Sequence, residues 1–287
     1  MIGSLLGALL PHAGAPMINS FSWFQLIPGF GEDAHLAHSL GLHDQEALSV
    51  IATSWLVVGL VLAFAVVARG QLAAALARQG TDKYVADDHL TARSAAEVLI
   101  EGLRNLFAGT LSGKDVDRYF PFLASIFTYI FCNNLIGFIP GLPPATESIS
   151  SNLAMAGIVF LVFNIAGLAR NGFGYIAHLA GPRLPLWLIP VTVLVFAIEL
   201  FSLFLRPATL TIRLSANIFA DHLVAGIMRD LGASAVDNPL LQAVLAVALP
   251  LPFFALGLLV CFVQAFVFTL LSTIYLGLAV AHDDGHH

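Results

Sequence analysis

The sequence predicts an all-α integral membrane protein, and three observations lead to that fold class. Hydrophobic residues make up 58% of the 287 residues and charged residues only 10%, where soluble domains carry about 25% charged residues. The mean hydropathy is +0.87. Apolar runs continue over roughly 20 residues, as in spanning helices, and lack the alternation of a membrane β-barrel. One bundle of about five spanning helices is therefore expected.

The first spanning helix is expected at residues 50–67, and the first basic residue of the chain, Arg69, follows it. Residues 1–49 contain four acidic residues but neither Lys nor Arg. Loops on the cytoplasmic side of a membrane protein carry an excess of Lys and Arg. We therefore expect residues 1–49 to be an extracytoplasmic segment and residues 69–118, with their seven basic residues, to be cytoplasmic.

The next elements complete the first unit, which we place at residues 50–186. Residues 95–111 carry Glu and Arg on one side and Leu, Val and Phe around the rest, which predicts a helix lying on the membrane surface. A second span at 119–139 leads outward to a turn-rich loop without basic residues. A third span at 153–169 returns inward, because the loop after it again carries arginines.

The last two apolar segments, at about 188–228 and 240–280, are unusually long. As continuous helices they would each measure about 60 Å, twice the hydrocarbon thickness of a bilayer. Either they form a steeply tilted hairpin over 187–281 that turns at 232–239, or they break at prolines. The prolines inside them are Pro207, Pro250 and Pro252. We favour the tilted hairpin, because membrane helices tolerate proline as a kink. Residues 282–287 would then be a solvated cytoplasmic tail.

Several classes of function are disfavoured by the composition. A net charge of −6 argues against a nucleic-acid partner, since phosphate binding needs clustered Lys and Arg. The sequence contains no Gly-rich phosphate loop, so no nucleotide site is expected. Cys132 and Cys261 lie in apolar sequence without the spacing of metal ligands, which predicts two thiols in the helical core. We expect neither a metal nor a cofactor.

The fourth segment carries a polar stripe on an otherwise apolar helix. At 100° per residue, seven polar side chains, counting Arg213, project within about 80° of Arg213. They are Glu199, Ser202, Arg206, Thr209, Arg213, Asn217 and Asp221. His222 projects about 180° away. Ordinary hydrogen bonding between helices explains Ser202 and Thr209, taken alone, just as well as a functional role does. It is disfavoured for the whole stripe with its two arginines, because a central arginine costs about 2.5–3.5 kcal/mol to insert.

Arg213 has no acidic neighbour one helical turn away. Asp221 lies about 12 Å along the axis, and Glu199 about 21 Å in the other direction. The interiors of the first three apolar segments contain neither Asp nor Glu. Water or a carboxylate from elsewhere must therefore meet this charge, and a carboxylate on another chain is the natural candidate.

The fifth segment presents a polar line that can face the stripe. Gln242, Gln264, Gly257 and Tyr275 project to one side of that helix. The glycine leaves room for a partner side chain or for water. An ordinary packing contact through a small residue explains Gly257, taken alone, just as well.

Two stretches carry a resemblance to a known family. RPATLTIRLSANIFADHLV at 206–224 begins at Arg206, and VQAFVFTLLSTIYL occupies 263–276. In this order, on the last two segments of a five-span chain, they resemble subunit a of the F-type, rotary ATP synthase, and the resemblance extends from about residue 50. It implies a stator subunit that provides two offset proton half-channels, which load and unload protons on the carboxylates of a rotating c-ring.

The resemblance also implies a setting. The implied partners are the c-ring, the b-type subunits of the peripheral stalk and the lipid bilayer. The chain would be a non-catalytic, proton-translocating subunit of the bacterial inner membrane. Its N-terminus would lie outside and its C-terminus in the cytoplasm.

Residue roles follow from the same resemblance. Arg213 matches the essential arginine that faces the c-ring carboxylates and keeps the half-channels from short-circuiting. Asn217 and Gln264 match amides near it, and Tyr275 matches a tyrosine near the end of the last helix. The positions that match the inner half-channel are Glu199, Ser202 and Thr209.

The chain departs from the family pattern on the outer side. His222 matches a position where many bacterial members carry a glutamate of the outer half-channel. Asp221 stands where the family often has Gly, while Gly257 stands where it often has His or Glu. We therefore expect the acid to have moved between helices and Asp221 to relay the proton. In the outer loop, Ser148 replaces a frequent aspartate, and neighbouring Glu147 is a candidate substitute.

Two other classes of protein compete with this interpretation. A self-contained secondary transporter with a midplane site predicts an internal repeat and carboxylates in the first three spans, and the sequence shows neither. A membrane scaffold without transport function leaves the polar stripe unexplained. The sequence leaves the coupling ion open, since selectivity would rest largely on the partner's carboxyl site.

Overall fold

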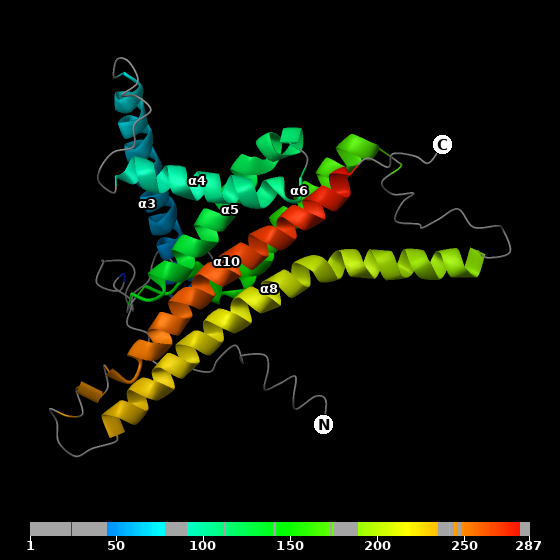
Figure 1. Ribbon diagram of the computed structural model, residues 1–287. Helices are drawn as coiled ribbons and strands as arrows, with labels where there is room; N and C mark the ends of the chain where they lie inside the picture. The colour runs from blue at the N-terminus through cyan, green and yellow to red at the C-terminus, as the bar shows by residue number, and fades with distance from the viewer. Residues whose placement is uncertain are drawn as a thin grey trace.

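The computed structural model places the apolar segments in one α-helical bundle (Figure 1). The described residues are 24, 45–77, 91–111, 113–139, 142–172, 174, 189–234, 241, 244–245 and 248–281. Within these ranges the chain forms helices and turns and no β-strand, which confirms the predicted fold class. The predicted tail at 282–287 and most of the predicted segment 1–49 lie outside the described residues.

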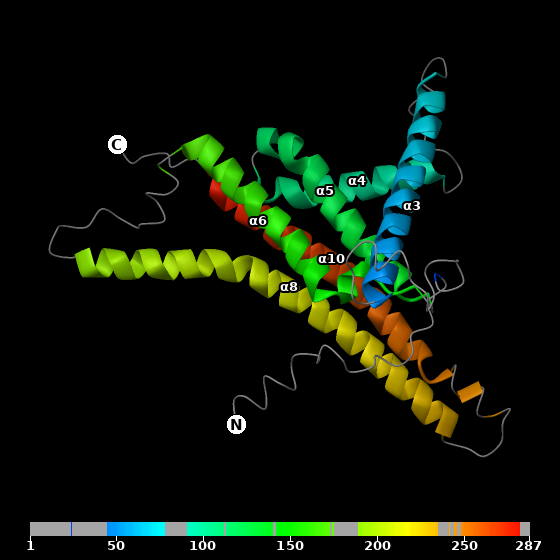
Figure 2. The ribbon, with the colours of Figure 1, turned by 180° about the vertical axis from the view of Figure 1, so that it is seen from behind.

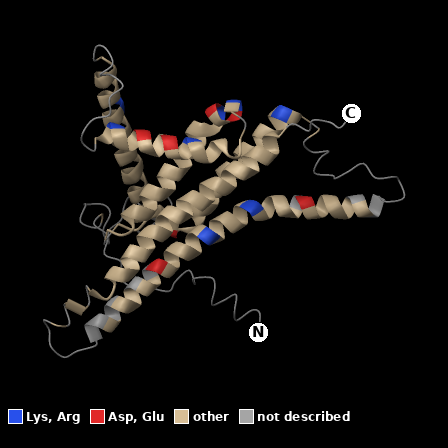
Figure 3. Cartoon of the chain, in the orientation of Figure 1, with Lys and Arg blue, Asp and Glu red and all other residues tan. Residues whose placement is uncertain are grey.

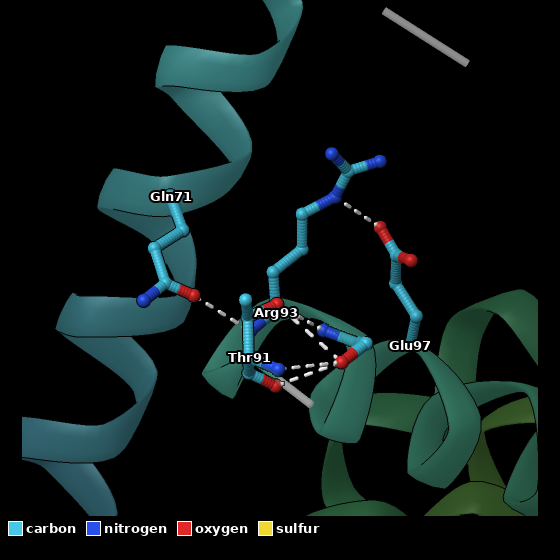
Figure 4. Close-up of polar contacts among 5 residues, drawn as sticks. Gln71, Thr91, Arg93 and Glu97 are labelled. Atoms are coloured by element: carbon cyan, nitrogen blue, oxygen red, sulfur yellow. Dashed lines mark hydrogen bonds and ion pairs between the residues drawn. The ribbon is translucent and has the colours of Figure 1, made fainter. Parts of the chain in front are cut away.

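The first span forms as α3 (Gln45–Leu76), longer at both ends than the sequence predicted. After it, α4 (Ala92–Ala108) crosses the end of α3, where the predicted surface helix was placed. Thr91 caps α4 in a capping box with Ser94, which satisfies donors that a helix start leaves free. Figure 4 shows this junction, in which the Gln71 side chain of α3 accepts a hydrogen bond from the Arg93 amide.

The middle of the bundle consists of α5 (Gly113–Ile136) and α6 (Ile149–Asn171). The outer loop between them contains one 3₁₀ turn, η3 (Ala145–Glu147). At the opposite end, Arg170 pairs with Asp115 at 2.6 Å, and the Asn171 amide donates to the Ala279 carbonyl oxygen at 3.1 Å. These contacts gather the start of α5 and the end of α6 on the side that the basic residues predict to be cytoplasmic.

The fourth segment is one continuous helix, α8 (Ile189–Ser234), which at 46 residues would measure about 70 Å. Pro207 lies inside it, so this proline kinks the helix without ending it, as predicted. Figures 1 and 2 show α8 bending between its yellow-green and yellow parts. Past the bend it runs beside α10 (Leu251–Val280), whereas its N-terminal part diverges from the bundle.

The fifth segment is not one continuous helix from residue 240, and at Pro250 the predicted alternative of a break at proline holds. Described residues 241, 244–245 and 248 are helical, a turn at 249–250 follows, and α10 begins at Leu251, with Pro250 at its N-cap and Pro252 in its first turn. Proline is favoured there, where its missing N–H and fixed φ cost nothing. The predicted turn at 232–239 was wrong at its start, since Gly232 still belongs to α8.

A hydrophobic core joins α4, α5, α6, α8 and α10. Large side chains that are less than 2% exposed include Phe107, Ile130, Phe163, Leu214 and Phe268. The two cysteines are free thiols within the helices, Cys132 half-buried and Cys261 buried. Outside this core the molecule is apolar as well.

Large apolar side chains cover the outside of the bundle. Trp55 is 73% exposed on α3, and Phe201 and Ile212 are 66% and 67% exposed on α8. A surface of this kind is stable against lipid and unstable in water. Within the described residues, five helices are long and apolar enough to cross a membrane. The fold is therefore that of an integral membrane protein.

Candidate functional site

Arg213 lies on the exposed face of α8, in the part of the helix that runs beside α10. Its side chain is exposed, as are those of the apolar neighbours Ile212 and Phe219. Charged residues are few along α8 (Figure 3), and no acidic residue of this helix lies within one turn of Arg213. Within the described part of the chain, Arg213 forms no ion pair. The bundle thus presents a cation on an apolar surface without supplying its counter-charge.

The neighbouring face of α8 packs into the bundle. Leu210, Leu214 and Ile218 are at most 6% exposed and belong to the hydrophobic core. They recur every four residues, so they form one buried ridge along the helix. Arg213 projects about 100° from the centre of this ridge and lies outside the buried arc, where its side chain is exposed.

Two side-chain contacts and one close approach to a glycine connect the polar stripe of α8 with α10, and we call these three levels the rungs. In the inner rung, the Arg206 guanidinium lies 5.0 Å from the centre of the Tyr275 ring. In the middle rung, the Asn217 amide donates to Gln264 Oε1 at 2.8 Å. The outer rung pairs Asp221 with Gly257, and Arg213 lies between the inner and middle rungs.

The outer rung shows why position 257 is a glycine. A Cβ atom added to Gly257 would lie 3.7 Å from Asp221 Cγ and 3.0 Å from the Phe138 ring. A larger side chain there would displace the ring, which also packs edge-on against Phe254. The acid on α8 and the missing side chain on α10 therefore face each other across one space, where the departure from the family pattern led us to expect them.

The middle rung is the most buried of the three. Gln264 is 3% exposed and Asn217 is half-buried. Gln264 Nε2 is buried, and no described residue forms a hydrogen bond with it. A buried donor of this kind costs free energy unless it gains a partner. The amide pair thus marks a polar point inside an apolar contact, one turn from Arg213.

The residues predicted for the inner half-channel are less enclosed. Glu199 and Thr209 are exposed and Ser202 is half-buried. The Thr209 hydroxyl donates to the Arg206 carbonyl oxygen of its own helix. Glu199 lies in the N-terminal part of α8, and no described side chain of another helix forms a hydrogen bond or ion pair with it. The structure therefore does not bring these three residues together into one site.

Some predicted residues cannot be placed or lie apart from the rungs. The His222 side chain and Gln242 are outside the described residues. In the outer loop, Glu147 is half-buried in η3, and Ser148 is the N-cap residue of α6. In the described part of the chain no group of three His, Cys, Asp or Glu side chains gathers as metal ligands do.

Sequence reasoning missed a buried polar cluster behind Arg213. It consists of Asn134 on α5, Thr146 in η3, Asn152 on α6 and Ser215 on α8. Ser215 projects about 200° from Arg213, so it was not counted in the stripe. A signal was present, because an asparagine near the end of an apolar span usually has a polar partner on another helix.

Comparison with known proteins decides the family. The family model for the ATP synthase A chain matches residues 51–277, which include every rung. The chain belongs to the ATP synthase A chain family. This result confirms the resemblance to subunit a, and all ten predicted site residues lie within the matched range.

Curated relatives from bacteria agree with this family assignment. The chain is 36% identical to ATP synthase subunit a of Bdellovibrio bacteriovorus, over 92% of this chain and 99% of the relative. It is 34% identical to the subunit a of Sorangium cellulosum, over 91% and 94% of the two chains. The subunit a of Geotalea daltonii is also 34% identical, over 88% and 95%. As a member of the A chain family, the protein is a multi-pass component of a bacterial ATP synthase membrane sector.

Proposed function

We propose that this chain is the stator of the proton channel in an F-type ATP synthase. It provides two offset half-channels that load and unload protons on the carboxylates of a rotating ring. The ring, b-type stalk subunits and the lipid bilayer are its partners. The chain carries out no bond chemistry of its own, and its N-terminus lies outside the inner membrane.

The observation that carries the proposal is the exposure of Arg213. A cation on an apolar surface is costly unless something meets it. The chain's own described carboxylates do not, since none forms an ion pair with Arg213. A carboxylate on a separate subunit accounts for both the charge and its exposure.

Arg213 affects the protonation state of the carboxylate that moves past it. Near Arg213 the ionised acid is favoured, because an opposite charge stabilises it. The protonated acid is neutral, so it can turn into lipid at low cost. The fixed positive charge also opposes direct passage of protons between the two half-channels.

On the outer side, the proton path runs through the outer and middle rungs. Asp221 relays the proton, with His222, Asn217 and Gln264 beside the path. What supports Asp221 is its position at the space left by Gly257. There it lies two turns from Arg213, about 12 Å along the axis, on the side away from the inner rung.

On the inner side, the acid loses its proton toward the cytoplasm. Glu199, Ser202 and Thr209 line this exit, the first two on the N-terminal part of α8 and Thr209 just past Pro207. What supports this is that the N-terminal part of α8 diverges from α10 (Figures 1 and 2) and that Glu199 and Thr209 are exposed, so a neighbouring subunit or water can reach them. Each proton that falls through 100 mV supplies about 2.3 kcal/mol for rotation.

The test replaces Arg213 in the assembled complex. Inverted membrane vesicles carrying Arg213→Ala should lose ATP-driven proton pumping down to the background. Arg118→Ala, which removes an arginine from the start of α5, should leave pumping intact. Normal pumping in assembled Arg213→Ala complexes would overturn the proposal and favour a purely structural role in the membrane.

A further inference from the structure

The buried cluster behind Arg213, which we call the polar junction, joins four elements through side chains. The Asn152 amide donates to Ser215 Oγ at 2.7 Å and to the Thr146 carbonyl oxygen at 2.6 Å. The Thr146 hydroxyl donates to Asn134 Oδ1 at 2.7 Å. None of the four residues is more than 8% exposed. Helices α5, α6 and α8 and the outer-loop turn η3 thus meet in one hydrogen-bonded network.

The junction lies on the side of α8 opposite to Arg213. Ser215 follows Arg213 by two residues, which turns it about 200° away. Ser215 is 8% exposed, whereas the Arg213 side chain is exposed. The neighbouring buried hydroxyl, Thr211, donates to the Pro207 carbonyl oxygen of its own helix and so makes no contribution to this network.

The junction is not built for maximal stability. Asn152 Oδ1 and Asn134 Nδ2 are buried and find no hydrogen-bond partner among the described residues. A buried, unpaired amide atom costs free energy, and an apolar side chain of similar size would avoid that cost. Buried polar groups of this kind can instead specify one register among several that apolar packing would allow.

Register matters here because the buried ridge of α8 is made of similar apolar residues. Leu210, Leu214 and Ile218 have comparable volumes, and a slip of one residue turns the helix by about 100°. Such a turn would move Arg213 from the exposed face toward the bundle. The bond from Ser215 to Asn152 exists in one rotation only, so it selects the rotation that keeps the arginine outside.

We propose that the polar junction is a positioning element for proton translocation, which holds α8 in the rotation that presents Arg213 to the partner carboxylate. Ser215 and Asn152 are its central pair, and Thr146 connects the pair to the outer loop. The proposal rests on the proposed function of Arg213. It assigns no proton transfer to these residues.

The experiment compares three variants in assembled complexes in inverted vesicles. Ser215→Ala removes the acceptor, Ser215→Thr retains a hydroxyl, and Thr211→Val removes the matched hydroxyl that serves only its own helix. The first measurement is proton pumping per ATP hydrolysed, normalised to assembled complex. The second is the passive proton leak after removal of the catalytic sector.

Loss of one hydrogen bond should lower the ratio of the working rotation to other rotations about fivefold. We expect Ser215→Ala to lower pumping per ATP by up to about that factor and to raise the passive leak, because the arginine separates the half-channels only in the working rotation. Ser215→Thr and Thr211→Val should behave like the unaltered chain. Asn152→Leu should lower pumping at least as much as Ser215→Ala, because it also removes the bond to the Thr146 carbonyl oxygen. Adding Ser215→Ala to Asn152→Leu should change little more, since the two changes share the bond between Ser215 and Asn152.

Three outcomes would overturn the positioning role. Unchanged pumping and proton leak in Ser215→Ala would contradict the positioning role. An equal loss of pumping in Thr211→Val would show that the effect comes from general packing of α8 and not from the bond between Ser215 and Asn152. Fewer assembled complexes with normal pumping per complex would show a purely structural role. Failure of the proposed function would be recognised by a different result, because complexes that carry Arg213→Ala would then still pump protons.

Discussion

Arg206 and Arg213 lie two turns apart on the same side of α8, yet their surroundings differ. Arg206 is half-buried, with its guanidinium 5.0 Å from the Tyr275 ring of the neighbouring helix. Arg213 is exposed, and in the described part of the chain it forms no ion pair. The face of an aromatic ring attracts a cation, and because Tyr275 belongs to the same chain as Arg206, this contact does not depend on another subunit. The first arginine is thus held by its own chain, and the second is available to a partner that comes and goes.

The same difference separates the two ends of the α8–α10 contact. On the inner side the contact is a cation over a ring, and on the outer side it is an acid facing a glycine. Among the three contacts between α8 and α10 in the described residues, the one on the outer side is the one that contains a carboxyl group. Substitutions should therefore have the largest effect on the outer side and the smallest on the inner side.

The largest effect is expected from Asp221→Asn, which retains the shape and removes the titrating group. General acid–base groups commonly contribute on the order of a hundredfold or more to rate, and we expect proton flux to fall by about that factor. Glu147→Gln, a matched change in the outer loop, should slow flux far less. Passive and ATP-driven flux in vesicles check this, and equal effects of the two changes would contradict the assignment of the relay to Asp221.

An intermediate effect is expected from Gln264→Leu. The Asn217 amide would lose its acceptor at 2.8 Å and stay partly buried, at a cost of roughly 1–3 kcal/mol to the contact between α8 and α10. Pumping per assembled complex should fall several-fold. The control is Thr269→Val, which removes a buried hydroxyl that bonds only to its own helix. If both variants lose pumping to the same extent, the middle rung has no special role.

The smallest effect is expected at the inner rung. Tyr275→Phe retains the ring under Arg206 and should pump normally. Tyr275→Leu removes the ring, and with it a contact worth about 0.5–2 kcal/mol, so pumping should fall modestly. A loss as deep as that of Asp221→Asn would contradict the distinction between the two ends of the contact. Initial pumping rates at equal amounts of assembled complex measure the difference.

Much of the fold could be predicted because its signals are local. Length, hydropathy and the distribution of Lys and Arg indicated five spans, and the described residues contain five helices that can cross a membrane. The start of α10 could not be predicted in this way. Proline is compatible both with a kink inside a membrane helix and with a helix start, and the chain uses both, with Pro207 inside α8 and Pro250 at the N-cap of α10.

The candidate site was also predictable only in part, for a similar reason. The helical projection put Arg206, Asn217 and Asp221 on one side of α8, because a regular helix fixes angles between its own residues. It could not reveal Ser215 as an anchor, since its partner, Asn152, comes from another helix 63 residues away. Contacts between helices depend on packing, which one helix's sequence does not encode.

The central claim is that the partner of Arg213 is a carboxylate on another subunit, and disulfide formation tests it most directly. Ile212 adjoins Arg213 and is 67% exposed, whereas Leu210 on the buried ridge is 3% exposed. Each is replaced by cysteine, in complexes whose ring subunit carries a cysteine next to its carboxylate. A disulfide requires Cβ atoms about 3.5–4.5 Å apart. The account predicts that Ile212→Cys links to the ring under mild oxidation and Leu210→Cys does not; no link from position 212 in assembled complexes would contradict it.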